Sequence, residues 1–191
     1  MRDAREVAPA MLGKLLVGAD GRVARLVEVE AYLGPEDPGS HAWRGPTPRS
    51  AIMFGEPGRL YVYFSYGMHW CANVVCSPEG VASAVLMRAA QPEQGIAAMT
   101  QARSHGQGAP RERDLCRGPA RLAEAFGITG AHNGLDLVAM PSGGLGAFWL
   151  AEDGKGPGGQ VVVTPRVGLS RGAELQLRFV VAGSPWASSL R

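Results

Sequence analysis

Apolar and polar side chains alternate along residues 27–31 within a largely apolar stretch, residues 22–33, which predicts a β-strand that ends at the break Gly34-Pro35. Successive side chains of a strand point to opposite faces of the sheet, so one face carries Val27, Val29 and Ala31, and the other carries Leu26, Glu28, Glu30 and Tyr32. We expect the valine face to be the core face and Glu28 to be an ordinary solvent-facing carboxylate. Glu30 lies just before the break, where the end of a strand can aim a side chain into a cleft.

The same pattern, read along the rest of the chain, predicts a mixture of strands and helices. Strands are expected at residues 14–18, 59–65, 69–76, 81–90, 161–167 and 175–182, with a further short one at 148–150 inside a glycine-rich surface loop, 141–160. Helices are expected at residues 4–12, 91–103 and 119–126, the last between Pro119 and Gly127. Short turns join 59–65, 69–76 and 81–90, so these strands form an antiparallel meander within one domain, residues 1–191.

Two connections stand out from ordinary surface loops. Residues 34–58 contain five prolines and five glycines, and a loop this long inside one domain is usually functional. The hairpin tip at Tyr66-Gly67-Met68 is apolar where a surface turn is normally polar. Either this tip is pushed into a binding partner, or it folds back onto the core.

Composition narrows the possible chemistry. The chain has 191 residues, 46% of them hydrophobic, and a formal net charge of +2, although residues 103–121 contain five arginines. That segment is either a solvated face or a phosphate contact. Three cysteines and four scattered histidines lack metal-ligand spacing, so we expect no zinc site, disulfide framework or cofactor. No signal sequence or membrane-spanning stretch is present, so a cytoplasmic protein is expected, or a nuclear one if the source is eukaryotic.

Several motifs, taken in this order, give the chain a recognisable signature. They are Val27-Glu28-Val29-Glu30-Ala31-Tyr32-Leu33-Gly34-Pro35-Glu36-Asp37 with His41, Thr47-Pro48-Arg49, Met53-Phe54, Tyr61-Val62-Tyr63 with Tyr66-Gly67-Met68 and Asn73, Leu86-Met87-Arg88-Ala89, Leu115-Cys116-Arg117-Gly118-Pro119, Arg166-Val167-Gly168 and Gly183-Ser184-Pro185-Trp186. Because these motifs occur together and in this order, the chain resembles the alkyladenine (3-methyladenine) DNA glycosylases, the single-domain type without a helix-hairpin-helix. The resemblance implies an α+β fold: a single domain with a curved, mostly antiparallel sheet, a protruding β-hairpin and surrounding helices.

The resemblance also implies how the protein would hold its substrate, which is double-stranded DNA containing a damaged purine. Tyr66 would intercalate through the minor groove with Met68 beside it, and His69 stands where some members have a second tyrosine. The extruded base would stack between Tyr32 on one side and His41 with Tyr63 on the other. Asn73 would exclude normal guanine by a clash with its exocyclic amine.

For catalysis, the resemblance implies that Glu30 deprotonates the attacking water, with Arg88 and the main-chain carbonyl of Val167 positioning that water. Thr47 and Arg49 have either DNA-backbone contacts or ordinary surface roles. The only two lysines, Lys14 and Lys155, lie outside every matched motif, so we expect a monofunctional enzyme without Schiff-base chemistry. We further expect a monomer without a cofactor, associated with the nucleoid if the source is bacterial.

Two other classes of protein remain open at this point. One is a catalytically silent module that binds damaged DNA, in which Glu30 only bonds backbone groups. The other is a hydrolase for free nucleosides, against which the apolar tip at Tyr66 argues, because a small substrate needs no wedge.

Overall fold

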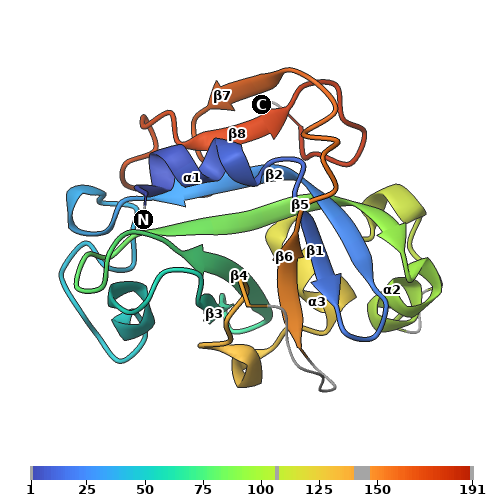
Figure 1. The fold of residues 1–191 in the computed structure, drawn as a ribbon, viewed down its shortest axis with the longest axis horizontal. Coiled ribbons are helices and arrows are strands. Elements are labelled where there is room, and N and C mark those ends of the chain that lie inside the picture. Colours follow the sequence, from blue (N-terminus) through green and yellow to red (C-terminus); the bar gives the residue numbers. More distant parts are fainter. Residues whose placement is uncertain (1, 106–107, 140–146, 190–191) are drawn as a thin grey trace.

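The computed structural model describes residues 2–105, 108–139 and 147–189, and shows one α+β domain built on a curled antiparallel sheet (Figure 1). Its strands are β1 (Leu15–Gly18), β2 (Val23–Tyr32), β3 (Leu60–Ser65), β4 (His69–Val75), β5 (Ala84–Gln94), β6 (Phe148–Ala151), β7 (Val161–Thr164) and β8 (Arg178–Val181). Its helices are α1 (Ala4–Met11), α2 (Ile96–Arg103) and α3 (Pro119–Phe126), with short 3-10 turns at Gly34–Glu36, Ala51–Phe54, Glu112–Asp114 and Gly130–His132. The predicted fold class is confirmed.

Strand β2 is the central strand of the sheet. The main path runs β3-β4-β5-β2-β1-β6, and β8 joins β2 on the same side as β1, further along the strand. All of these pairings are antiparallel, and β3, β4 and β5 form the predicted meander. Helix α1 packs on β2, and α3 packs on β4 and β5. The residues at the end of β2 therefore lie where several strands meet.

The expectation that one face of β2 is solvent-facing is wrong. Nine of its ten residues are buried, and Glu28 and Glu30 are both 0% exposed. The strand is paired along both edges and covered on both faces, so alternation does not separate core from solvent here. Register shifts around Glu28 also mark a β-bulge, which re-aims side chains. Glu28 is thus a buried carboxylate rather than a surface one.

The predicted helix 91–103 begins too early. Strand β5 continues to Gln94, because Gln91 and Gln94 pair with Arg25 and Val23 of β2, and the helix starts only after Gly95, whose φ is 71°. The late strands β7 and β8 are shorter than predicted. Helix α3 has the predicted bounds: Pro119 opens it, and Gly127 ends it in the left-handed conformation at φ 68°.

Two apolar clusters fill the interior. The larger one lies between the sheet and its helices. The smaller one contains Met53 and Tyr61 and supports the long loop between β2 and β3, together with Ala42, Val75, Ala82 and Ala84. Of the predicted loop 141–160, residues 141–146 lie outside the described part of the chain. No helix among the described residues has the length and apolar character needed to cross a membrane.

Candidate active site

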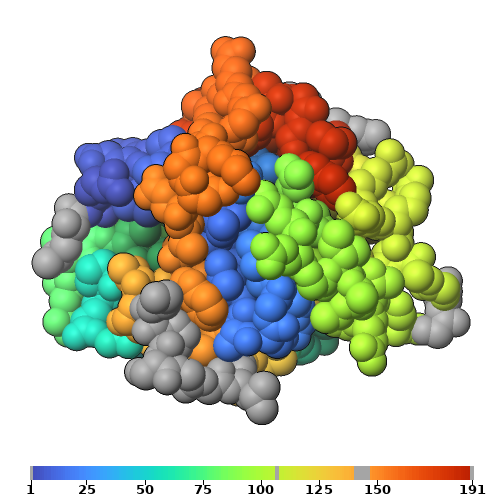
Figure 2. Space-filling view, turned by 45° about the vertical axis from the view of Figure 1, so that its right-hand side comes forward, coloured from blue at the N-terminus to red at the C-terminus, as the bar shows by residue number. Residues whose placement is uncertain are grey.

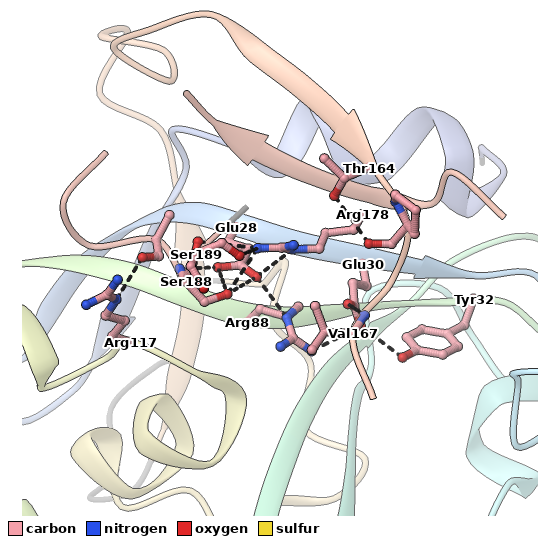
Figure 3. A network of polar contacts seen from close by, with 12 residues as sticks. Glu28, Glu30, Tyr32, Arg88, Arg117, Thr164, Val167, Arg178, Ser188 and Ser189 are labelled. Atoms are coloured by element: carbon pink, nitrogen blue, oxygen red, sulfur yellow. Dashed lines mark hydrogen bonds and ion pairs between the residues drawn. The ribbon is translucent and has the colours of Figure 1, made fainter. Parts of the chain in front are cut away.

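Glu30 lies at the C-terminal end of β2, with its carboxylate completely enclosed. The backbone N–H of Val167 donates to Oε1 at 2.8 Å, and the Tyr32 hydroxyl donates to Oε2 at 2.9 Å. The Nη1 of Arg88 lies 3.2 Å from the same Oε2 (Figure 3). Three donors from three segments therefore fix one carboxylate, which brings together the residues predicted to be catalytic.

Val167 makes a contact that the resemblance did not imply. Its N–H binds Glu30 directly, whereas the prediction concerned its carbonyl and a water molecule. Tyr32 also has a contact that the sequence did not indicate, because its hydroxyl reaches Glu30. Burial and then the charge of Glu30 raise the pKa of Tyr32 well above its usual value, so the phenol stays protonated and can donate.

An aromatic cleft of about 500 Å³ opens in front of Glu30. Its lining includes Tyr32, His41, Tyr63, Arg88 and Val167, and a smaller recess continues from it toward Tyr61 and Asn73. Three of the lining residues, Tyr32, Arg88 and Val167, also contact the carboxylate of Glu30, so that carboxylate lies directly behind the cleft wall. The four residues predicted to form the base pocket therefore lie together around the cleft and its recess: Tyr32 on β2, Tyr63 on β3, Asn73 on β4 and His41 in the loop after β2.

His41 and Asn73 are both fixed by neighbouring groups in this pocket. The His41 ring packs edge-on against Tyr63 with centroids 4.5 Å apart, and its Nδ1 is 2.9 Å from the Tyr61 hydroxyl. Desolvation, together with the charge of Arg49, lowers the pKa of His41 to about 4, so the ring is neutral at neutral pH. Asn73 donates from Nδ2 to the carbonyl of Tyr61 at 3.0 Å.

The tip of the β3–β4 hairpin projects into solvent rather than folding back. Tyr66 is 83% exposed and Met68 is 67% exposed, and His69 beside them is also exposed. Tyr66 and Gly67 have φ values of 50° and 66°, the positive pair that a type I′ hairpin turn requires. Such a conformation is strained for a tyrosine, and strained residues cluster at functional sites. These observations favour the interpretation that the tip is inserted into a binding partner.

Thr47 and Arg49 both stabilise the loop that precedes the hairpin. The Thr47 hydroxyl is 2.9 Å from that of Ser50, and Arg49 donates to the carbonyl of Phe64 at 3.1 Å while covering the Tyr63 ring. Both residues are exposed, and Arg49 also lines the cleft, so a contact with DNA stays a prediction. In the basic segment, Arg111, Arg113, Arg117 and Arg121 gather around Asp114.

A buried ion pair that sequence reasoning missed joins the two loops of the pocket. Arg166 and Asp37 are both fully enclosed, and Nη2 of the arginine donates to Oδ1 of the aspartate at 2.6 Å. The guanidinium also lies 4.6 Å from the centre of the Tyr32 ring. Both residues fall inside the quoted motifs, but only the fold shows that they meet.

Within the described residues, no group of three or more histidine, cysteine, aspartate or glutamate side chains is placed to hold a metal ion. The three cysteines, Cys71, Cys76 and Cys116, are buried free thiols.

The fold and this site define a class: a single-domain α+β enzyme whose buried carboxylate lies behind a cleft lined by aromatic rings. Comparisons with known proteins identify the family. The methylpurine-DNA glycosylase family model matches residues 1–185. A relative from Burkholderia lata is 50% identical over 187 residues, covering 98% of this chain and 87% of its own. One from Rhodopseudomonas palustris is 48% identical over 188 residues, covering 98% and 86%.

A relative from Leifsonia xyli is 50% identical over 188 residues, covering 96% of this chain and 86% of its own. The names of all three relatives contain the words 3-methyladenine DNA glycosylase. The chain belongs to the methylpurine-DNA glycosylase family and is a DNA glycosylase, a hydrolase of N-glycosyl bonds.

Proposed function

We propose that this protein is a monofunctional base excision repair enzyme, a monomer in the bacterial cytoplasm, that removes 3-methyladenine and related damaged purines from double-stranded DNA. The observation that carries the proposal is the enclosed carboxylate of Glu30 behind a cleft lined by aromatic rings. Relatives whose names specify 3-methyladenine support the choice of lesion.

Glu30 acts as the general base in this proposal. It accepts a proton from a water molecule, and the remaining hydroxide forms a bond with C1′ of the deoxyribose. The bond between C1′ and the base nitrogen breaks, and its electron pair leaves with the base. The negative charge of Glu30 also favours the positive character that develops on the sugar. Support comes from the donors of Val167 and Tyr32, which hold the carboxylate in one orientation.

The hairpin tip and the aromatic rings hold the substrate. Tyr66 enters the duplex from the minor groove and fills the space that the extruded nucleotide leaves, with Met68 and His69 next to it. The base stacks between Tyr32 and the pair His41 and Tyr63. A neutral His41 favours this arrangement, because a 3- or 7-alkylated purine is cationic and a charged imidazole would repel it.

Asn73 selects against undamaged guanine. Its side chain lines the inner recess and is held by Tyr61, so it cannot turn aside to admit an exocyclic amine. Deaminated purines and etheno-purines are neutral, so they are poorer leaving groups than cationic alkylated purines. We propose that they are slower substrates.

The test is a substrate panel. Duplexes carrying 3-methyladenine, 7-methylguanine, hypoxanthine or ethenoadenine are incubated with the protein, and released base and strand breaks are measured before and after alkali. We expect release of 3-methyladenine, breaks only after alkali, and no release from an undamaged duplex. Strand cleavage without alkali would contradict a monofunctional enzyme, and no release from any duplex would favour a silent damage-binding module.

Shortening the wedge separates duplex repair from hydrolysis of free nucleosides. For Tyr66→Ala we expect weaker damaged-duplex binding, by about tenfold to a hundredfold, since base contacts of this kind contribute about 1–3 kcal/mol. Val81→Ala is the matched control: Val81 is an exposed apolar residue in the β4–β5 connection, at the opposite end of the meander. Binding is measured by titration of labelled duplex. Unchanged binding and excision in Tyr66→Ala would remove the argument for a wedge.

A further inference from the structure

A second buried carboxylate, Glu28, lies two residues before Glu30 and is enclosed by donors from three other segments (Figure 3). Arg88 on β5 and Arg178 on β8 each donate from Nε to Oε1 at 2.9 Å. Ser188 donates from its backbone N–H to Oε2 at 2.7 Å, and its hydroxyl lies 2.7 Å from both oxygens. Burial alone would raise the pKa of Glu28, but Ser188 and the two guanidinium groups outweigh it and lower the pKa overall. Glu28 is therefore a fixed negative charge.

Arg88 is the connection between the two carboxylates. Its position on β5 lies between Leu86 and Ala89, which pair with Glu30 and Glu28 across the sheet. The Nε of Arg88 binds Glu28, and Nη1 lies 3.2 Å from Oε2 of Glu30. A guanidinium is a rigid plane, so fixing Nε also fixes the direction of Nη1.

Without Glu28, the guanidinium would be free to turn and to form a two-pronged pair with Glu30. Such pairs are among the strongest ionic contacts, and both carboxylate oxygens take part in them. The oxygens would then be engaged by Arg88 instead of accepting a proton from water. Glu28 thus limits Arg88 to a single contact with the general base.

The C-terminal segment, residues 184–189, holds Glu28 in this position. Besides the contacts of Ser188 with Glu28, Arg178 donates from Nη2 to the carbonyl of Ser189, and Arg117 donates to the carbonyl of Ala187 at 2.8 Å. Figure 2 shows the C-terminal residues, in red, lying against the yellow segment that precedes α3. The segment is anchored from two sides, and its serine reaches the centre of the sheet.

We propose that Glu28 and Ser188 are positioning residues for catalysis: they hold Arg88 against one oxygen of Glu30, so the C-terminal segment takes part in the reaction. This inference rests on the proposed role of Glu30 as the general base.

Ser188→Ala is the sharpest test, because it removes one hydroxyl and leaves the backbone N–H that binds Glu28. Base release is followed in a single turnover, with the wild-type protein or variant in excess over 3-methyladenine duplex. We expect the rate constant to fall about tenfold, since misplacement within a reaction centre costs up to about a hundredfold. Affinity for damaged duplex should stay within about twofold of wild type. Ser188→Thr, which keeps the hydroxyl, should restore the rate.

Ser184→Ala is the matched control, since Ser184 lies in the same segment and, among the described residues, its hydroxyl accepts only one long bond, from the N–H of Trp186. A purely structural role would lower the amplitude of the single-turnover curve, because fewer molecules fold, and would leave the rate constant unchanged. Glu28→Gln should slow release by about a hundredfold. Adding Ser188→Ala to it should cause little further loss, because the two residues act through one group.

A wild-type rate constant in Ser188→Ala, or an equal loss in Ser184→Ala, would overturn the inference. A failure of Ser188→Thr to restore the rate would also contradict it.

Glu30→Gln, measured in parallel, separates the proposed function from the positioning role of Glu28 and Ser188. If Glu30→Gln releases base normally, the proposed function fails. If it is inactive while Ser188→Ala is as fast as wild type, only the positioning role fails.

Discussion

Replacing Glu30 with glutamine is expected to lower the single-turnover rate of 3-methyladenine release by about a thousandfold, within the range of about 10²–10⁴ for a general base. The amide cannot accept the proton of the attacking water, and it removes the negative charge next to the sugar. Binding to damaged duplex should persist, because the proposed wedge, Tyr66, and the rings of the cleft are unchanged. Released base and duplex affinity are measured on the same preparation.

The surroundings of Glu30 decide how this variant is interpreted. They are all donors, namely Val167 N–H, the Tyr32 hydroxyl and Arg88, so the new amide nitrogen must face at least one of them. An unmatched buried polar group costs about 1–3 kcal/mol of stability, so thermal unfolding is recorded alongside the rate. Glu36→Gln serves as the control, because Glu36 is exposed in the loop that follows β2. Normal release by a folded Glu30→Gln protein would exclude Glu30 as the base.

Local patterns predicted the elements that local forces determine. Proline and glycine have fixed conformational preferences, so Pro119 and Gly127 marked both ends of α3. Alternation and a glycine-proline break placed Glu30 at the end of a strand. The local pattern predicts a helix for residues 91–94, but they form a strand because they pair with β2, and no local pattern records that pairing.

The burial of Glu28 could not be predicted for a similar reason. A carboxylate on an alternating strand normally faces water, and the contrary result depends on Arg88, Arg178 and Ser188, which are 60, 150 and 160 residues further along the chain. The resemblance implied that Glu30 is the general base and that aromatic rings form the base pocket, but it gave no role to Glu28. Long-range pairs between oppositely charged residues become visible only when the sheet is assembled.

Asp37→Asn is expected to lower the free energy of unfolding by about 3–5 kcal/mol, the usual cost of removing one partner from a buried ion pair. The substitution leaves the guanidinium of Arg166 enclosed without its counter-charge, although Arg166 keeps its bonds to the carbonyls of Ala31 and Gly172. Asparagine retains one acceptor for the backbone N–H groups of Leu33 and Gly39, which the aspartate now binds. Denaturant unfolding of wild type and variant measures the difference.

The double variant Asp37→Asn/Arg166→Met distinguishes an uncompensated charge from a general loss of packing. If the buried charge causes the loss, removing it should recover most of the stability, because apolar replacement of a whole buried pair is often neutral. Glu152→Gln breaks the surface pair with Lys14 and should change stability by at most about 1 kcal/mol. A recovered double variant should still excise slowly, because the loops that carry His41 and Val167 are no longer joined across the pocket. Equal stability of Asp37→Asn and Glu152→Gln would show that the buried pair contributes no more than an exposed one.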